Sequence, residues 1–283
     1  MKVLLVGAYG QLGHALQQSL TVHDVRAYGK DALDISNRER TRQLVEEVNP
    51  DIVINAAAYT QVDQAESDGS MAYRMNAVGP QNLALTAEAL GIPLVHISTD
   101  YVFDGTQTEP YHEFDRPNPR SMYGKSKLAG EEIVRATARR HFIIRTAWLY
   151  HTVGHNFPKT ICNVAQRSDV RVVNDQFGSP TFAPHLATAI ERLLTTHAYG
   201  TYHLAGAGGT SWFEFTQELF AQMNIQTSIT PVSTKEFPRP APRPAYAILT
   251  TVQDPFILLP PWKQGVAEFA QHYSPQFHEK LLG

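Results

Sequence analysis

A tyrosine and a lysine stand four residues apart in the stretch SMYGKSKLAGEE, which covers residues 121–132. If this stretch is helical, Tyr123 and Lys127 lie on one face of the helix, about one turn apart. An ammonium group beside a phenol lowers the pKa of the phenol, so the pair could act as a tuned proton donor. The same spacing also fits a surface tyrosine beside a solvated lysine, and the choice depends on the elements around the pair.

A second candidate is the glycine pattern GAYGQLG, which places Gly7, Gly10 and Gly13 directly after an apolar run. Glycines between a strand and a helix let the backbone approach a pyrophosphate, which sits at the N-terminus of the helix. Unpaired N–H groups and the helix dipole favour an anion there. A tight structural turn is the alternative, but the position between the first strand and the first helix favours a dinucleotide site.

Over the first half of the chain, segments with the apolar pattern of a buried strand alternate with segments that have the apolar spacing of a helix. Continuous apolar runs are typical of strands buried on both faces, and the segments between them repeat apolar residues at helical spacing. Ser36 followed by Glu39 predicts a capping box, and Gly91 predicts the end of a helix. Such repeated β-α units indicate an α/β fold with a doubly wound parallel sheet of the Rossmann type. The predicted strands are 2–8, 24–28, 51–58, 93–99 and 141–149, and the predicted helices are 12–20, 36–48, 71–90 and 126–140.

Beyond residue 150 the alternation loosens, and glycine- and proline-rich turns separate the elements. We expect a dinucleotide-binding domain over residues 1–150. Residues 151–283 are expected to form mainly a smaller lobe, partly interleaved with the first domain, with some segments that return to the core. The proline-rich residues 237–244 are expected to cover the substrate. The elements predicted in this part are strands 170–175 and 200–206 and helices near 184–195 and 211–222.

The composition limits the classes of protein to consider. With 24 Lys and Arg, 27 Asp and Glu and a formal charge of −3, the chain lacks the basic balance typical of nucleic-acid binding. No segment approaches the ~20 apolar residues of a membrane span, and the N-terminal apolar run is too short for the core of a signal peptide. The single cysteine, Cys162, excludes an intramolecular disulfide and a multi-cysteine zinc site, and it is expected to be a packed side chain. We expect a cytoplasmic protein whose partners include neither nucleic acid nor a membrane.

The end of the second strand indicates which dinucleotide is bound. An acidic residue there holds the ribose hydroxyls of NAD, whereas a basic residue accommodates the 2′-phosphate of NADP. Gly29 and Lys30 stand where the acid is expected, and Asp34 follows, either beside the adenine or ahead of the Ser36 cap. The sequence therefore predicts NADPH as the cofactor, with NADH also accepted.

Thr99 is a third residue that could act together with Tyr123 and Lys127. It ends the strand of residues 93–99, and ligands of open α/β sheets bind at the carboxyl ends of the strands. Its hydroxyl could therefore point at the carbonyl that Tyr123 would protonate. Together, Thr99, Tyr123 and Lys127 resemble the catalytic residues of the extended short-chain dehydrogenase/reductase superfamily.

Longer phrases narrow this resemblance. They are NAAAYTQVDQAE (55–66), STDYVFDG (98–105), YGKSKLAGE (123–131), RTAWLY (145–150), NDQFGSPT (174–181) and RP (243–244). In the same order, and over nearly the whole chain, they resemble the dTDP-4-dehydrorhamnose reductases. The resemblance implies reduction of the 4-keto group of dTDP-4-dehydro-L-rhamnose to give dTDP-L-rhamnose. It also implies that the lobe of residues 151–283 mainly binds the sugar nucleotide.

The resemblance also implies a role for each matching residue. Tyr123 would donate the proton, and Lys127 would hold the nicotinamide ribose and lower the pKa of Tyr123. Thr99 and Asp100 would meet the sugar, and Trp148 would lie against it. The expected cofactor residues further include Gly7, Gly10, Gln11, Leu12, Gly13, Lys30, Asp34, Ile35, Ala58, Tyr59 and Thr60, and the expected substrate residues further include Asn156, Phe157, Asp175, Gln176 and Arg243.

Several alternatives stay open on the sequence. A sugar-nucleotide dehydratase of this superfamily carries a glutamate after the threonine and aspartate, but Tyr101 follows Asp100 here, which favours reduction. An epimerase, a 4-ketoreductase for another nucleotide-linked deoxysugar, and a non-catalytic regulatory subunit of the methionine adenosyltransferase type remain possible. Trp148 could be a core residue, and Asp175 and Arg243 could form a surface ion pair.

Some members of the family are homodimers bridged by magnesium, for which they use a glutamate two residues after the third glycine. This chain has Ala15 at that position. The resemblance therefore carries over neither the metal nor that dimer. We expect no metal site, and either a monomer or a weak homodimer.

Overall fold

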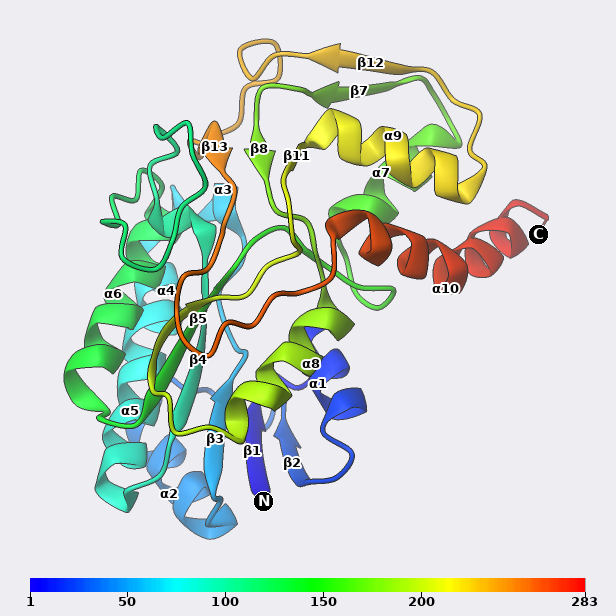
Figure 1. Ribbon diagram of the computed structural model, residues 1–283. Helices are drawn as coiled ribbons and strands as arrows, with labels where there is room; N and C mark the ends of the chain where they lie inside the picture. Colours follow the sequence, from blue (N-terminus) through cyan, green and yellow to red (C-terminus); the bar gives the residue numbers. More distant parts are fainter. Residues whose placement is uncertain (283) are drawn as a thin grey trace.

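The computed structural model describes the backbone of residues 1–282 and the side chains of residues 1–273. Its centre is a six-stranded parallel sheet with the strand order β10-β5-β4-β3-β1-β2 (Figure 1). The order of the strands reverses beside β1, and ligands of such sheets bind at this point, outside the carboxyl ends of the strands. The predicted doubly wound parallel sheet is confirmed. The strands are β1 (Lys2–Val6), β2 (Asp24–Tyr28), β3 (Ile52–Asn55), β4 (Leu94–Thr99), β5 (His141–Thr146) and β10 (Gly200–His203).

Helices cover both faces of this sheet, as its apolar strands require. In β1, Val3 and Leu5 pack into the core beneath α1 and α8, whereas Leu4 and Val6 pack into the core beneath α2 and α5. Figure 1 shows α1 and α8 together on one face, and α2, α5 and α6 on the other. These helices are α1 (Gln11–Ser19), α2 (Arg38–Val48), α5 (Gly79–Leu90), α6 (Met122–Thr137) and α8 (Ala183–Leu194).

The start of α2 differs from the expected capping box. Asn37, and not Ser36, caps this helix, because its side chain accepts a hydrogen bond from the backbone N–H of Arg40. The Ser36 hydroxyl donates to Asp34 at 2.6 Å and accepts from Arg74 at 2.7 Å. These two contacts occupy the hydroxyl that the capping box would need.

The helix expected over residues 71–90 is divided into three parts. A π-helical turn separates a short first helix from α5, and Gly91 ends α5 in the left-handed conformation, with φ of 67°, as predicted. The short elements in this half of the chain are α3 (Val62–Ala65), α4 (Gly69–Tyr73), the π-helical turn η1 (Arg74–Val78) and the 3₁₀ turn η2 (Asp100–Val102).

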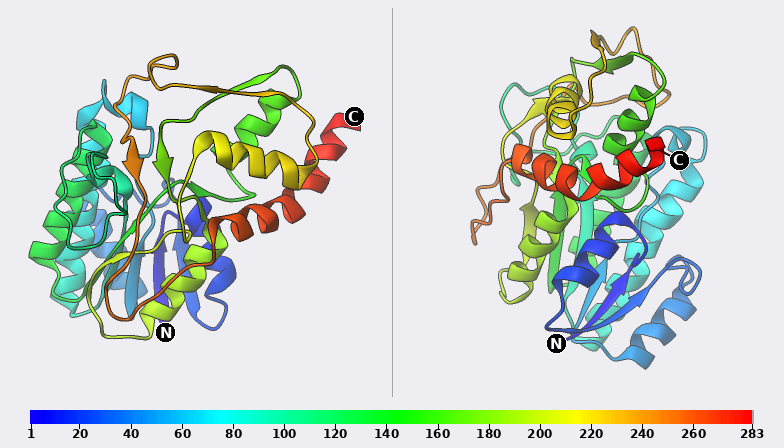
Figure 2. Two further views of the ribbon diagram at one scale, coloured as in Figure 1. Left: turned by 45° about the horizontal axis from the view of Figure 1, so that its top comes forward. Right: turned by 90° about the vertical axis from the view of Figure 1, so that its right-hand side faces the viewer.

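The remaining elements gather beyond the carboxyl ends of the sheet strands, most of them in the upper part of Figure 1, with α10 at its right; Figure 2 gives two further views. Cys162 is buried among them, with its Sγ 3.5 Å from Sδ of Met223, so its prediction as a packed side chain is confirmed. None of the helices in the described part of the chain is long and apolar enough to cross a membrane. The domain boundary at residue 150 stays a prediction. These elements are β6 (Leu149–Tyr150), α7 (Phe157–Ala165), β7 (Val170–Val173), β8 (Phe177–Gly178), β9 (Thr181–Phe182), β11 (Thr210–Ser211), α9 (Trp212–Met223), β12 (Ile229–Val232), β13 (Tyr246–Ala247) and α10 (Trp262–Leu282).

Helix α6 approaches its neighbours closely at two glycines. A Cβ on Gly124 would lie 2.2 Å from the carbonyl oxygen of Tyr101, and a Cβ on Gly130 would lie 2.1 Å from that of Asn76. Both neighbours are backbone atoms, which cannot move aside by a change of rotamer. Because only glycine leaves this room, α6 lies directly against η2 and the π-helical turn. The first contact brings Tyr123 to the carboxyl end of β4.

We expect Gly130→Ala to lower the free energy of unfolding by about 1–3 kcal/mol, because its methyl group overpacks the contact with the π-helical turn. Gly69→Ala is the matched control, since the atoms nearest to its Cβ, 3.2 Å away, belong to the flexible side chain of Met122. Urea unfolding followed by circular dichroism measures both changes. A Gly130→Ala protein as stable as the wild type would contradict the close approach of α6.

Candidate active site

The turn between β1 and α1 has the geometry of an anion site. Gly7 has a φ of +87°, and its Cβ would lie 2.5 Å from the backbone N of Ala57. A Cβ on Gly13 would lie 2.2 Å from the carbonyl oxygen of Gly7, so glycine lets α1 start directly against the turn. Gly10 precedes α1 without a side-chain cap, and no acidic residue stands in the first helical turn. The first N–H groups of α1 lack intrahelical partners and suit a phosphate.

A polar surface follows the end of β2. Lys30 is exposed there, two residues after the strand ends. Asp34 accepts hydrogen bonds from Ser36 at 2.6 Å and from Arg74 at 3.1 Å, and the bond from Ser36 lowers the pKa of Asp34 most. Ile35, by contrast, is buried in the core and lies beneath this surface.

The loop after β3 carries Ala58, Tyr59 and Thr60 past the same edge of the sheet. Asn76 of the π-helical turn holds this loop: its Oδ1 accepts from the N–H of Tyr59 at 2.8 Å, and its Nδ2 donates to the carbonyl of Tyr59 at 3.1 Å. The same Nδ2 donates to the hydroxyl of Ser126 at 3.0 Å, so Asn76 ties the loop to α6. The sequence did not indicate Asn76, because no apolar period marks a π-helical turn.

Thr99, Asp100 and Tyr123 meet at the carboxyl end of β4. The Thr99 hydroxyl caps η2: it accepts from the N–H of Tyr101 at 3.2 Å and donates to Oδ1 of Asp100 at 2.9 Å. The Thr99 hydroxyl lies near enough to the Tyr123 phenol to lower its pKa. Its ring meets the Tyr101 ring edge-on, with 5.5 Å between the ring centroids. The structure therefore brings together the threonine and the tyrosine that the sequence singled out.

Burial controls the protonation of the Tyr123 phenol. It raises the pKa of Tyr123 to about 12, against the lowering effect of the Thr99 hydrogen bond, and the charge of Asp100 adds to the rise. Lys127 is not among the groups that shift this pKa in the polypeptide alone, so the expectation that it lowers the pKa of Tyr123 stays a prediction. Tyr123 is thus protonated at neutral pH, as a proton donor must be.

Lys127 lies one helical turn beyond Tyr123 and is only 2% exposed. Its Nζ donates to the carbonyl oxygen of Ile97 on β4 at 2.5 Å. Burial lowers the pKa of Lys127 to about 8, and the carboxylate of Glu131 acts in the opposite direction. The alternative of a solvated surface lysine is therefore wrong.

A buried ion pair fixes the middle of α6 to β5. Arg145 contacts Glu131 at two points, with 2.7 Å between Nη2 and Oε2 and 3.0 Å between Nε and Oε1. The Ser98 hydroxyl donates to the same carboxylate at 2.6 Å. Burial alone would raise the pKa of Glu131, but the hydrogen bonds and charge of Arg145, together with the Ser98 hydrogen bond and the charge of Arg135, hold that pKa below its ordinary value. The carboxylate is therefore charged and depends on Arg145.

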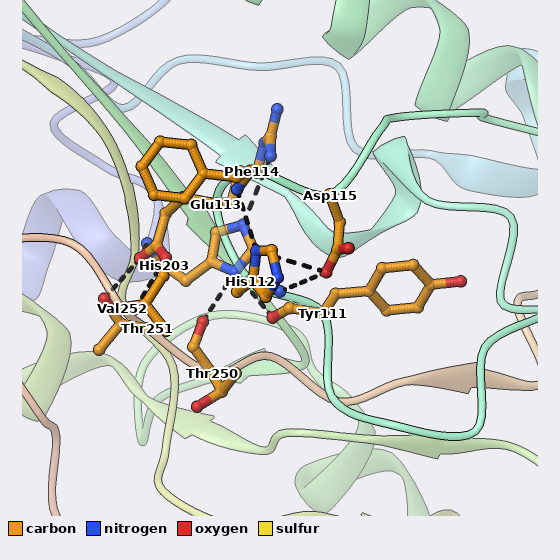
Figure 3. A network of polar contacts seen from close by, with 10 residues as sticks. Tyr111, His112, Glu113, Phe114, Asp115, His203, Thr250, Thr251 and Val252 are labelled. Atoms are coloured by element: carbon orange, nitrogen blue, oxygen red, sulfur yellow. Dashed lines mark hydrogen bonds and ion pairs between the residues drawn. The ribbon is translucent and has the colours of Figure 1, made fainter.

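His203 extends this network to the loops beyond β4 and β10 (Figure 3). Its Nδ1 lies 3.1 Å from the carbonyl oxygen of Tyr111 and 3.0 Å from that of Thr250, so we assign the ring proton to Nδ1. Nε2 can then accept from Nη1 of Arg145, 3.4 Å away. The backbone N–H of His203 donates to Glu113 at 2.9 Å. Burial lowers the pKa of His203, which keeps the ring neutral.

Trp148 stands between the sheet and the elements beyond it. Its backbone has a φ of +45°, an uncommon conformation for a non-glycine residue that tends to occur at ligand sites. The ring stacks on that of Trp212, with 3.5 Å between centroids, and passes over Gly178, whose Cβ would lie 2.4 Å from it. Phe157 packs against the Trp212 ring, with 4.4 Å between the ring centroids. The Trp148 side chain is only half-buried, so it differs from an ordinary core residue.

Asn156 connects the turn at β1 with the elements beyond the sheet. Its Nδ2 donates to Oε1 of Gln11 at 2.9 Å and to the carbonyl of His151 at 2.6 Å, and its Oδ1 caps α7 through the N–H of Lys159. A residue expected at the substrate is thereby bound to one expected at the cofactor. Leu12, next to Gln11, is buried in the core, so only its backbone is suited to contact a cofactor.

The last three expected substrate residues fall into two groups. Asp175 accepts from the hydroxyl of Thr234 at 2.6 Å, and Gln176 donates to the same hydroxyl at 3.0 Å. Arg243 instead forms a two-point ion pair with Asp63 on α3, at 2.6 and 3.0 Å. The alternative of an Asp175–Arg243 surface pair is therefore wrong. Asp63 lies in the segment 55–66, which the sequence analysis singled out. Its pairing with Arg243, far along the chain, could not be inferred from the sequence.

Arg145→Met tests the ion pair that holds α6. We expect it to lower the free energy of unfolding at pH 7 by about 3–5 kcal/mol, because it leaves the Glu131 carboxylate buried without its partner. Arg139→Met is the control: Arg139 bonds Glu88 at 2.6 Å, but its side chain is 88% exposed, so we expect a loss of about 0–1 kcal/mol. Denaturant unfolding measures both. Equal effects of the two changes would contradict a structural role for the buried pair.

Comparison with known proteins agrees with this geometry. The family model described as "RmlD substrate binding domain" matches residues 1–274. The spore coat polysaccharide biosynthesis protein SpsK of Bacillus subtilis is 40% identical over 278 residues, which cover 96% of this chain and 98% of that protein. The dTDP-4-dehydrorhamnose reductase of Burkholderia thailandensis is 39% identical over 288 residues, covering 94% of this chain and 97% of that protein.

Solved structures give the same result. The crystal structure of dTDP-4-dehydrorhamnose reductase from Bacillus anthracis in complex with NADP has a TM-score of 0.92 at 42% identity. The match covers 96% of this chain and 99% of that one. The similarity therefore extends over both the sheet and the elements beyond it. The chain belongs to the RmlD substrate binding domain family, together with the dTDP-4-dehydrorhamnose reductases.

Proposed function

We propose that this protein uses NADPH to reduce the 4-keto group of dTDP-4-dehydro-L-rhamnose to dTDP-L-rhamnose, a step of dTDP-rhamnose biosynthesis. The observation that carries the proposal is the placement of Thr99 and the buried Tyr123 together at the carboxyl end of β4, with the buried Lys127 one turn away. Membership of the family supports the choice of substrate.

The residues around the β1–α1 turn fit a dinucleotide. The uncapped N-terminus of α1 suits a pyrophosphate, and the nearest atom to a Cβ on Gly10 would be 3.4 Å away, which leaves room beside the backbone. The exposed Lys30 suits the 2′-phosphate that distinguishes NADPH from NADH. The Bacillus anthracis reductase was crystallised with NADP, which supports NADPH here, with NADH also accepted. When bound, the cofactor supplies the hydride for the carbonyl carbon.

Tyr123 supplies the proton for the carbonyl oxygen. Burial keeps its phenol protonated at neutral pH, and the Thr99 hydroxyl orients it at the end of the strand. Lys127 is proposed to hold the nicotinamide ribose, and its charge stabilises the phenolate that remains once the proton has left. Because water is excluded from the buried Tyr123, its interactions with Thr99 and with the charge of Lys127 are stronger than they would be in water.

The elements beyond the sheet are proposed to hold the sugar nucleotide. The strained backbone and half-buried ring of Trp148 support a place against the sugar. Asn156 and Arg243 are also proposed to hold these elements against the dinucleotide-binding half of the chain, because each forms a contact with that half. The proposed substrate residues are Thr99, Asp100, Trp148, Asn156, Phe157, Asp175, Gln176 and Arg243.

The alternatives make different demands on the site. A non-catalytic regulatory subunit has no need of a buried, protonated tyrosine in contact with a threonine. A reductase for another nucleotide-linked deoxysugar would use the same residues, because such sugars differ by single hydroxyl groups, so substrate comparison must separate the two. A monomer or weak homodimer, and a location in the cytoplasm, remain predictions from the sequence.

Tyr123→Phe tests the proposed proton donor. We expect kcat to fall by roughly 10²–10⁴-fold, the usual contribution of general acid catalysis, with little change in cofactor affinity. The assay follows NADPH oxidation with dTDP-4-dehydro-L-rhamnose. Tyr202→Phe is the control, since this buried tyrosine on the edge strand β10 donates to the carbonyls of Ala198 and Asp254, which are not proposed site residues.

Near-normal kcat in Tyr123→Phe would remove the tyrosine from the mechanism. A wild-type protein that oxidises NADPH with a different 4-keto sugar, and not with this one, would replace the proposed substrate. No turnover with any such sugar would refute the enzymatic function itself.

A further inference from the structure

The proline-rich segment leads into a stretch that contacts other parts of the chain closely. Residues 237–240 are exposed, whereas Ala241 is only 2% exposed and begins the strap, residues 241–247, which ends in β13. Within the strap, Pro244 packs on Gly105, where a Cβ would lie only 2.5 Å from that of Pro244. The strap is therefore the part of this segment that can position other residues.

Asp63 binds one end of the strap to α3. Nη1 of Arg243 donates to Oδ1 of Asp63 at 2.6 Å, and Nη2 donates to Oδ2 at 3.0 Å. The backbone N–H of Ala241 donates to the same Oδ1 at 3.1 Å. The side chains of Asp63 and Arg243 are 33% and 18% exposed, so water screens this pair less than it screens a fully exposed one. A two-point contact of this kind fixes direction as well as distance.

The other end of the strap lies beside the proposed sugar contact. The carbonyl of Ala245 accepts from the N–H of Phe177 at 2.8 Å, and β13 pairs with β8 from there (Figure 1). Strand β8 ends at Gly178, against which the ring of Trp148 packs. The strap therefore runs from Asp63 to the strand that supports the Trp148 ring.

Helix α3 also contacts the helix of the proposed proton donor. Glu66, the residue after α3, accepts at Oε1 from the N–H of Met122 at 2.8 Å, and Met122 directly precedes Tyr123 in α6. Ala65 of α3 is buried in the same apolar cluster as Tyr123. Helix α3 thus has a fixed place beside Tyr123, and Asp63 fastens the strap to that place.

We propose that Asp63 is a positioning residue, which fastens the strap through Arg243 and thereby holds the sugar nucleotide within reach of Tyr123. The inference rests on the proposed function, in which Trp148 contacts the sugar and Tyr123 gives its proton to the carbonyl oxygen. Asp63 acts through Arg243 and needs no contact with the substrate. Because the sugar nucleotide binds best when the strap is fastened, a loose strap lowers the apparent affinity in proportion to the fastened fraction.

Asp63→Asn removes the charge of this side chain, keeps its size and leaves one acceptor oxygen in place of two. We expect KM for dTDP-4-dehydro-L-rhamnose to rise roughly tenfold, since a hydrogen bond between charged groups is lost. We expect kcat, and the dissociation constant of NADPH measured by fluorescence titration, to change by less than about twofold. A merely structural role would reduce the amount of folded protein, which lowers the apparent kcat and leaves KM unchanged.

Glu88→Gln is the matched control. Glu88 is 28% exposed and also accepts from one arginine side chain and one backbone N–H, at 2.6 Å from Nε of Arg139 and 2.9 Å from its backbone N–H. Arg139 stands two residues before β5, at the end of the sheet opposite to the site. We expect KM and kcat of Glu88→Gln to match those of the wild type.

Hydrogen exchange followed by mass spectrometry reports on the strap without an activity assay. The N–H of Ala241 is bonded to Asp63 in the wild type. In Asp63→Asn we expect the strap to exchange at least about threefold faster, because its local opening becomes easier. The exchange of the strap should be unchanged in Glu88→Gln.

Arg243→Gln tests the pair from its other side, and it serves as the test if Asp63→Asn does not fold. If Asp63 acts through Arg243, each single variant and the double variant should raise KM and strap exchange to a similar extent. Effects of the two single variants that add up in the double variant would show two independent roles, and would overturn the proposal.

An unchanged KM or an unchanged exchange of the strap in Asp63→Asn would also overturn the proposal. NADPH binding weakened as much as sugar binding would overturn it as well, because the pair would then act on the cofactor half of the site. A wild type without reductase activity, in which Asp63→Asn still loosens the strap, would instead refute the proposed function.

Discussion

The contact between the first half of α6 and the carboxyl end of β4 is the constraint on which the site depends. Gly124 lets the helix press against the carbonyl of Tyr101, and Lys127 binds the carbonyl of Ile97. Both contacts are made to backbone, so they place Tyr123 relative to the sheet itself and not relative to a mobile side chain. The Arg145–Glu131 pair holds the same helix further along.

The same packing decides the charge of each reactive group. Burial raises the pKa of Tyr123 and of Asp100 and lowers that of Lys127, so every shift favours the neutral form. A phenol with a high pKa is ready to donate but leaves a costly phenolate. The ammonium of Lys127, one helical turn away, reduces that cost. The site therefore combines a stable donor with a cation that stabilises the phenolate.

Much of the fold could be predicted because its signals are local. Apolar strands, helical spacing and the glycine turn each lie within one segment, and the glycines of the turn are required by backbone contacts that any such turn makes. The contacts of Asn76 with Tyr59 and of Asp63 with Arg243 join segments that are distant in the sequence. The local sequence around each residue does not indicate which residue it will contact. The cap at Asn37 was missed because a third residue, Arg74, engages Ser36.

The spacing of Tyr123 and Lys127 predicted two neighbouring side chains on one helix face, but it could not predict that burial raises the pKa of the tyrosine. Sequence spacing reveals which charge is near, whereas desolvation depends on everything that packs around it.

The ionisation of Tyr123 tests the role of burial most directly. Tyrosine labelled with ¹³C at Cζ, with the Tyr123 signal identified by its loss in Tyr123→Phe, can be titrated by NMR in the protein without cofactor. We predict a pKa of about 12, above the ordinary value of about 10. A Tyr123 that ionises below the ordinary value would show that the ammonium of Lys127 dominates, and would contradict the control of this site by burial.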